Sequence, residues 1–423
     1  MGMTATEKIL ARASGRVAVR AGETVYPDPD LVIVDDGYIE YSKKMLDERR
    51  IHGLFDPKRV MFVTDHAVVY TTSQLVARGA AIRRAVKDWG VENFYDVGEG
   101  GNAHILSLES GMVLPGTFLF ANDSHTSNNG AIGAVGMRTG TEIVTVLATG
   151  TLWTEVPYSI RVTLSGRLPD GVYARDLGYR MARDFTNGTY GAEWDYRVLE
   201  FAGGALDDLT LAQRVAICNT VTEIGVTNVF FPPNAAILDY AKARALRPFT
   251  PVYSDADACY EAEIAIDLDT LEPQVVLPGA PDRATDIGEA AGRRIDHAFI
   301  GSCGSGMYED LQVTAKMLAG KRVAAGTRLF IVPGTVASAK RIVDDGLMKI
   351  FQDAGAIVLP AGCGPCTKGN MAPLAAGEVS ICTAVTNVPG RTGAKDAEIY
   401  LASPATVACS AVQGQISDPR VHA

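Results

Sequence analysis

Three cysteines lie in positions suited to binding a metal. Cys363 and Cys366 are separated only by Gly364 and Pro365, and Cys303 precedes them in a glycine-rich segment. A two-residue spacer lets both thiolates face one metal, the Gly-Pro pair favours the required turn, and Cys303 could supply a third ligand. The other cysteines lie in apolar or mixed segments and are best explained as small buried thiols, namely Cys218, Cys259, Cys382 and Cys409.

Four kinds of chemistry are compatible with these thiols. A redox dithiol would place Cys363 at the start of a helix and would leave Cys303 without a role. A structural zinc site takes four protein ligands, here three cysteines and one histidine. An iron–sulfur cluster with three cysteine ligands leaves one iron open to a substrate oxygen, where it acts as a Lewis acid. Cys303 could instead be a nucleophile with His125 as its base.

Histidines paired with carboxylates form a second set of candidate residues. Asp65 directly precedes His66, Asp123 lies two positions before His125, and His104 lies between the two pairs. A neighbouring carboxylate fixes the tautomer of an imidazole and raises its basicity, which suits proton transfer to or from a leaving hydroxyl group. One such pair is equally consistent with a surface turn, but the combination indicates a site.

A helix expected over residues 211–225 carries two polar residues on one face. Asn219 and Glu223 are four positions apart, among apolar neighbours such as Val215 and Ile217. This face is either exposed to solvent or part of a site wall. The glycines at positions 98–101 and around Cys303 match no complete nucleotide-binding pattern.

Short apolar runs alternate with amphipathic helical segments, which predicts an α/β fold with largely parallel sheets. The expected strands are 59–64, 117–120, 297–300, 329–332 and 356–359, and a helix is expected over 308–320. Ligands of open α/β sheets gather beyond the carboxyl ends of the strands. Because four of these strands are followed by acid, imidazole or thiol groups, we expect the candidate residues to meet in one site.

Length and charge limit the remaining possibilities. A chain of 423 residues is expected to form several domains, for which the sequence suggests 1–160, 161–282 and 283–423. The 39 basic and 49 acidic residues give a net charge of -10, which disfavours binding to nucleic acid. The sequence shows no leader and no apolar run long enough for a membrane span, so a cytoplasmic location is expected.

Several motifs together resemble the aconitase superfamily, in particular the large subunits of isopropylmalate dehydratase, homoaconitase and dimethylmalate dehydratase. The likeness covers nearly the whole chain. It rests on Asp65-His66, Asp123-Ser124-His125-Thr126-Ser127, Ile217-Cys218-Asn219 with Glu223, Ile300-Gly301-Ser302-Cys303 with Tyr308-Glu309-Asp310-Leu311, and Gly362-Cys363-Gly364-Pro365-Cys366.

The resemblance implies three α/β/α domains around a 4Fe-4S cluster held by Cys303, Cys363 and Cys366. It also implies a set of catalytic residues around the leaving hydroxyl, a polar residue near the cluster at Asn219, and substrate-carboxylate contacts at Ser124 and Arg391. The implied catalytic residues are Asp65, His66, His104, Asp123, His125 and Glu223.

The resemblance further implies a partner. Single-chain aconitases carry an additional domain that supplies a serine base and an arginine, and no such domain is recognised here. We therefore expect a separate small subunit of about 150 to 200 residues, roughly one domain, to complete the site.

Three departures from the family pattern bear on the substrate. The usual Cys-Thr-Asn is Cys303-Gly304-Ser305, the segment that usually contains Asn-Arg has Val385-Thr386, and Tyr38 adds bulk in a segment that is usually Asp-Gly-Thr-Ser. Loss of an arginine removes charge-assisted bonds of about 1.5 to 3 kcal/mol each to a carboxylate. We therefore expect a hydro-lyase for a small hydroxy acid other than citrate. The alternatives are a genuine 3-isopropylmalate dehydratase and a cluster-free RNA-binding or regulatory relative, the latter disfavoured by the negative charge.

Overall fold

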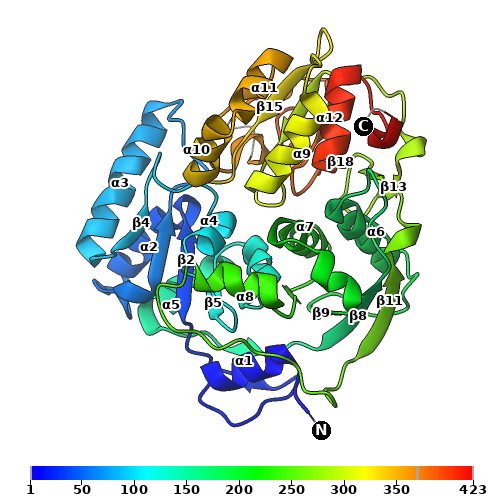
Figure 1. Ribbon diagram of the computed structural model, residues 1–423. Coiled ribbons are helices and arrows are strands. Elements are labelled where there is room, and N and C mark those ends of the chain that lie inside the picture. The colour runs from blue at the N-terminus through cyan, green and yellow to red at the C-terminus, as the bar shows by residue number, and fades with distance from the viewer. Residues whose placement is uncertain (1, 368–370, 422–423) are drawn as a thin grey trace.

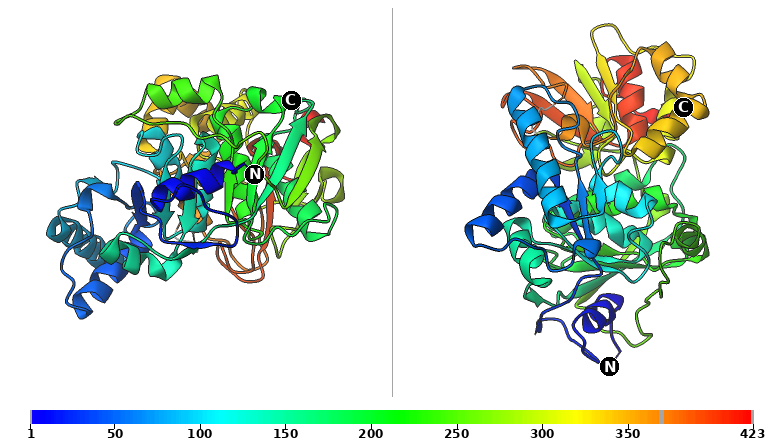
Figure 2. Two further views of the ribbon diagram at one scale, coloured as in Figure 1. Left: turned by 90° about the horizontal axis from the view of Figure 1, so that it is seen from below. Right: turned by 90° about the vertical axis from the view of Figure 1, so that its left-hand side faces the viewer.

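The computed structural model describes residues 2–367 and 371–421. Three separate sheets, each accompanied by helices, form three lobes around the middle of the molecule (Figure 1). The right-hand view of Figure 2 shows the yellow to red elements of the third lobe above the cyan elements of the first. The predicted α/β class with mainly parallel sheets is confirmed. Among the described residues, no helix combines the length and apolarity needed to cross a bilayer.

The first lobe is built on a parallel five-stranded sheet in the order β4-β3-β2-β5-β6. Successive residues of its central strands enter two different cores: Ile33 and Met61 face one, whereas Val34 and Phe62 face the other. Burial on both faces explains why these strands are continuous apolar runs. The strands are β2 (Leu31–Asp35), β3 (Val60–Val63), β4 (Asn93–Tyr95), β5 (Phe118–Ala121) and β6 (Val135–Arg138), and the helices are α2 (Asp36–Glu48), α3 (Ser73–Trp89), α4 (Ala103–Glu109) and α5 (Ile143–Thr149).

The second lobe has a parallel four-stranded sheet in the order β10-β9-β8-β11. Alternate residues of the edge strand are buried and exposed, so at this edge one face of the sheet is open to solvent. The strands are β8 (Ser159–Ser165), β9 (Val198–Ala202), β10 (Asn228–Phe230) and β11 (Ala262–Asp267), and the helices are α6 (Ala174–Thr186), α7 (Leu211–Thr222) and α8 (Ala235–Lys242).

The third lobe has a seven-stranded mixed sheet in the order β13-β12-β18-β17-β14-β15-β16. Strand β12 pairs antiparallel with both β13 and β18, and the other neighbours are parallel. The strands are β12 (Gln274–Val276), β13 (Ala284–Asp286), β14 (His297–Ile300), β15 (Arg328–Ile331), β16 (Ile357–Val358), β17 (Val379–Cys382) and β18 (Glu398–Ala402), and the helices are α9 (Tyr308–Leu318), α10 (Val336–Asp344), α11 (Leu347–Ala354) and α12 (Pro404–Gln413). Strand β12 lies before residue 282 in the sequence but belongs to this sheet. The domain boundary near residue 282 stays a prediction.

The N-terminal part of the chain links two of the lobes. Helix α1 (Ala5–Ala13) begins at the capping residue Thr4 and is anchored to the second lobe, where Thr6 donates hydrogen bonds to the buried Glu200. A short ribbon of β1 (Thr24–Val25) and β7 (Thr154–Glu155) joins distant segments of the first lobe.

Backbone hydrogen bonds join the first and third lobes next to the candidate residues. The amide of Asn102 donates to Gly334 O over 2.7 Å, and the amide of Cys363 donates to Asp65 O over 3.0 Å. These contacts bring the loop after β3 against the loop after β16, although the two are far apart in the sequence.

Candidate active site

A left-handed backbone turn after β14 presents Cys303 to the middle of the molecule. Ser302 has a φ of 68°, a conformation that few non-glycine residues adopt, and its hydroxyl donates to Thr383 O over 3.0 Å. This hydrogen bond to the loop that follows β17 stabilises the turn. Cys303 is only 6% exposed.

The Cys-Gly-Pro-Cys segment forms a single 3₁₀ turn, Gly364–Cys366, after β16. Gly364 has a φ of 60°, and a Cβ there would lie 2.6 Å from a methyl group of Val332. A glycine is therefore required both for the backbone conformation and for the close approach. The start of a longer helix, which a redox dithiol would require, is not present in the described residues of this segment, 363–367.

Asparagine amides from the other two lobes contact the sulfur atoms. Asn219 on α7 of the second lobe donates to Cys303 Sγ over 3.0 Å, and Asn102 of the first lobe donates to Cys363 Sγ over 3.0 Å. Hydrogen bonds of this type stabilise metal-bound thiolates. The helix predicted at 211–225 is α7, which ends at Thr222, and the alternative of a solvent-exposed polar face is wrong, because Asn219 is fully buried.

The three thiols influence one another electrostatically. Burial raises the pKa of Cys303 to about 11, and the nearby Cys366 adds to the increase. Burial and the Asp65 carboxylate raise the pKa of Cys363, with smaller contributions from Cys303 and Cys366. Three thiols whose charges act on one another, two of them bonded to amides, fit an iron–sulfur cluster better than a lone dithiol.

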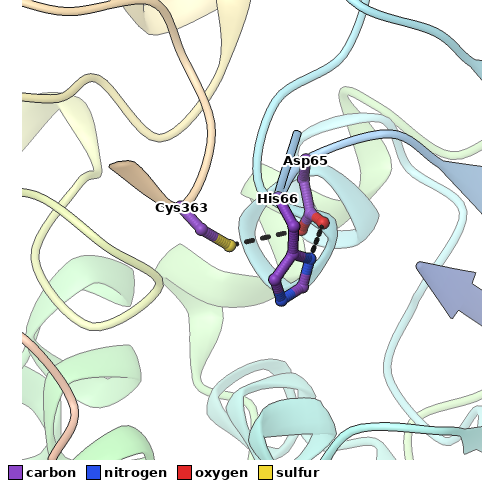
Figure 3. A group of neighbouring side chains, drawn as sticks. All are labelled: Asp65, His66 and Cys363. Carbon is purple, nitrogen blue, oxygen red and sulfur yellow. Dashed lines mark hydrogen bonds and ion pairs between the residues drawn. The ribbon is translucent and has the colours of Figure 1, made fainter. Parts of the chain in front are cut away.

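Asp65 links His66 to Cys363 in the loop after β3 (Figure 3). One carboxylate oxygen lies 2.6 Å from His66 Nδ1, and the other lies 3.6 Å from Cys363 Sγ and accepts the Ala103 amide over 2.9 Å. Asp36 also lies 3.2 Å from His66 Nδ1. Although burial opposes protonation, the pKa of His66 is raised by Cys363 and these carboxylates.

Asp123 holds two imidazoles at once. Its Oδ1 lies 3.1 Å from His104 Nε2 and 3.0 Å from His125 Nδ1, and the other ring nitrogen of His125 lies 2.9 Å from Glu223 Oε1. The contact with Glu223 has the distance of an ion pair without the alignment of a hydrogen bond. Four of the predicted residues are thus linked one to the next: His104, Asp123, His125 and Glu223. We call this set the Asp123 chain.

Charge in the Asp123 chain favours an imidazolium next to a carboxylate. Although burial opposes it, hydrogen bonds from His104 and His125 hold the pKa of Asp123 well below its usual range. Burial likewise opposes protonation of His125, but Cys303, Asp123 and Glu223 raise its pKa well above the usual value. The Asp123 side chain is 35% exposed, against 8% for each histidine, so its carboxylate lies at the open side of the chain.

The two predicted carboxylate contacts lie at the same site. Ser124 begins a 3₁₀ segment directly after Asp123, and Arg391 donates from Nε to Cys366 O over 2.8 Å. Burial tends to lower the pKa of Arg391, yet Cys366 and, more weakly, Glu223 and Asp123 raise it. Tyr38, by contrast, is on α2 and packs edge-to-face on Tyr41 with ring centroids 6.1 Å apart.

Four residues of the site were missed by sequence reasoning. Asp36 accepts the backbone amides of His66 and Ala67, and Asn128 donates to Cys303 O over 3.0 Å. The position of Asp36 after the apolar run of β2 was a usable signal. In the sequence, Asn102 resembles an ordinary helix cap and Arg175 an exposed residue of a first helical turn, so neither indicated its role. The four missed residues are Asp36, Asn102, Asn128 and Arg175.

The amino-acid sequence of this chain is similar to those of known proteins. A model of the aconitase family (aconitate hydratase) matches residues 58–294 and 288–414. The chain belongs to the aconitase family. It is 40% identical to 3-isopropylmalate dehydratase large subunit 1 of Methanopyrus kandleri, over 100% of both chains. It is 38% identical to a probable methanogen homoaconitase large subunit of Methanosarcina mazei, over 93% of this chain and 99% of that one.

A solved structure supports the fold. The holo-form of aconitase X from Thermococcus kodakaraensis superposes with a TM-score of 0.52 at 11% identity, covering 90% of this chain and 89% of that one. The family model and the two relatives confirm the predicted superfamily, and the chain is an enzyme of the hydro-lyase class.

Proposed function

We propose that this chain is the large subunit of an iron–sulfur dehydratase that reversibly eliminates water from a small hydroxy carboxylic acid other than citrate. The observation that carries the proposal is that three mutually interacting thiols of one lobe receive amides from the other two lobes, beside an imidazole–carboxylate chain. The names of the relatives support the reaction class but leave the substrate open.

The residues that would hold a 4Fe-4S cluster are Cys303, Cys363 and Cys366. The amides of Asn219 and Asn102 would stabilise two of the three thiolates. When bound, such a cluster supplies an iron without a protein ligand, which polarises the hydroxyl group of the substrate.

The Asp123 chain would manage the proton of the leaving hydroxyl. His125 is held protonated between Asp123 and Glu223, at a position 3.0 Å and 2.9 Å from their oxygens. An imidazolium fixed in this way can donate its proton to the departing hydroxyl, which leaves as water, and the ring stays neutral until it is protonated again. Asp65 and His66 form a second such pair beside Cys363, with Asp36 as its outer partner.

Substrate recognition would rest on Ser124 and Arg391. The Nε of Arg391 is occupied by Cys366 O, which leaves its terminal nitrogens to face a carboxylate. At position 386, where the family usually has an arginine, Thr386 is 7% exposed and supplies no charge. One guanidinium in place of two favours a substrate with fewer carboxylates than citrate.

A small subunit would supply the missing base. The relatives are named large subunits, which implies a separate partner chain. We propose that this partner contributes the serine that removes the carbon-bound proton, so that the present chain alone has little or no activity.

The test is anaerobic reconstitution of the chain together with its co-expressed small subunit. Iron and sulfide are quantified, and hydration or dehydration is assayed with citrate, 3-isopropylmalate and methyl-substituted malates. The proposal predicts cluster-dependent turnover of a methyl-substituted malate or a similar acid, with citrate inert. Full activity in an iron-free preparation would refute it.

A second candidate is a genuine 3-isopropylmalate dehydratase. The full-length match at 40% identity to a subunit of that name favours it. The same substrate panel separates the two, because this candidate requires 3-isopropylmalate to have the highest kcat/KM.

A further inference from the structure

Arg175, near the start of α6, is buried beside the cysteine turn. Its side chain is among the largest that are fully buried, at 1% exposure. The guanidinium donates to Tyr179 Oη over 2.7 Å and to Ala384 O over 2.9 Å. Through Nη1 it also donates to Asn219 Oδ1 over 3.3 Å and to Ser305 Oγ over 3.5 Å. It thereby ties the second lobe to two loops of the third.

The acceptors of Arg175 are all neutral. Among residues 2–367 and 371–421, no carboxylate lies within ion-pair distance of its guanidinium. A buried cation without an anionic partner is costly to maintain. The negative groups that act on it are Cys303 and, more weakly, Asp310; burial raises the pKa of Asp310 to about 8, which leaves Cys303 as the main candidate for the balancing charge.

Gly304 makes room for this guanidinium. A Cβ at position 304 would lie 2.1 Å from Nη1 of Arg175 and 2.2 Å from Oδ1 of Asn219. The threonine that usually follows the first cysteine in the family would therefore collide with both groups. The departure at Gly304 is explained by the contact between Arg175 and Asn219.

That contact determines which end of the Asn219 amide faces the sulfur. An amide has one oxygen and one NH₂ group. Because Arg175 binds the oxygen, the NH₂ group is directed to Cys303 Sγ, at 3.0 Å. Arg175 therefore orients the amide that donates to the sulfur.

Arg214 on α7 gives a matched comparison. It is equally buried, at 0% exposure, but it donates to the backbone carbonyls of Leu206, Leu209 and Pro232. Burial lowers the pKa of Arg214 to about 10. Burial has the same tendency at Arg175, but Tyr179 and Cys303 overcome it and raise the pKa.

We propose that Arg175 is a positioning residue for the thiolate-bound centre: it fixes the Asn219 amide on Cys303 and supplies the buried positive charge that balances the thiolates. This inference rests on the proposed function, because the balanced charge is that of a cluster held by Cys303, Cys363 and Cys366. Hydrogen bonds and positive charge near the sulfur atoms raise the reduction potential of such a centre.

The experiment measures the midpoint potential of the reconstituted full-length chain by a redox titration followed by electron paramagnetic resonance. Arg175→Gln removes the charge, Arg175→Lys retains it with fewer donors, and Arg214→Gln is the control. The expected result is a potential that is more negative in R175Q, a smaller shift in R175K, and the wild-type potential in R214Q.

Gly304→Ala provides a second approach that leaves the arginine in place. Its added Cβ should push Nη1 off Asn219 and shift the potential in the same direction as R175Q, so it decides the matter if the Arg175 variants do not fold. The inference is overturned if R175Q or G304A keeps the wild-type potential, or if R214Q shifts it equally. A wild-type chain that binds no iron and sulfide overturns the proposed function itself.

Discussion

Asn102 of the first lobe donates its side-chain amide to the sulfur of Cys363 in the third lobe over 3.0 Å. The same side chain uses its oxygen to accept the amide of His104 over 3.1 Å, at the start of α4. One residue therefore orients both a proposed cluster ligand and a proposed catalytic histidine. The second lobe contributes a similar amide, since Asn219 donates to the sulfur of Cys303.

Replacing Asn102 by alanine should weaken the retention of iron. The variant loses a hydrogen bond to a charged sulfur, worth about 1.5 to 3 kcal/mol, which corresponds to roughly a 10- to 150-fold faster loss of iron. The rate is measured by transfer of iron to a chelator. Asn93→Ala, which removes an exposed amide bonded to Lys58 O, should release iron at the wild-type rate. Equal rates in N102A and N93A would contradict the assigned contact.

Replacing Asp123 by asparagine should reduce kcat by about 10²- to 10⁴-fold, the usual contribution of a positioned acid or base. The variant removes the charge that holds both His104 and His125 in place. Turnover at saturating substrate is compared with that of Asp88→Asn, a change on the exposed surface of α3. Iron content should be unchanged in both variants. An active D123N enzyme would remove the Asp123 chain from the mechanism.

Replacing Cys303 by serine should abolish iron binding and activity together. The comparison is Cys409→Ser, which alters a buried thiol of α12 that packs in the third lobe's core. Iron analysis and turnover are measured on the same preparations. A C303S protein that keeps its iron but loses activity would favour the alternative in which this residue is a nucleophile.

Stability should fall in acid because of His297, which is 1% exposed and bonded to Ser380 Oγ over 2.9 Å. Burial, helped by Arg328, lowers the pKa of His297 to about 4. The unfolded chain, with an ordinary histidine pKa near 6.5, then binds more protons between pH 6.5 and 4. The contribution of neutral His297 to the free energy of unfolding is complete above pH 6.5 and is lost as pH falls through 4. The total loss is on the order of 3 kcal/mol.

The measurement for His297 is urea unfolding at pH 7 and pH 4.5. His297→Gln should lose less unfolding free energy than the wild type between these two values. His52→Gln is the control, because the His52 side chain is 76% exposed. The same pH dependence in wild type and H297Q would show that this histidine does not cause the acid sensitivity.

Sequence periodicity predicted the strands that lead to the site because they are buried on both faces. The run at 297–300 matches β14, and the helix expected at 308–320 is α9, which ends at Leu318. The strand expected at 356–359 is shortened to Ile357–Val358. The antiparallel pairing of β12 was not predicted, since a three-residue strand carries almost no periodic signal.

Site residues were predictable where two chemical groups are adjacent in the sequence and hidden where they meet only in three dimensions. Asp65-His66 stands out by itself, whereas the contact between Arg175 and Asn219 joins two different helices. Gly304 was noticed as a departure from the family pattern, but its cause required the position of the guanidinium.

The amides of Asn102 and Asn219 reach their sulfur atoms from separate lobes, at 3.0 Å in each case. Hydrogen bonds weaken steeply once the angle at the hydrogen falls below about 120°. Any rotation of one lobe against another therefore changes the electronic environment of the ligands before it breaks a single covalent or metal bond. The hydrogen bonds to the cysteines thus depend on how the lobes are packed. A partner that shifts a lobe would alter the spectrum and the reduction potential of the proposed cluster without contacting it.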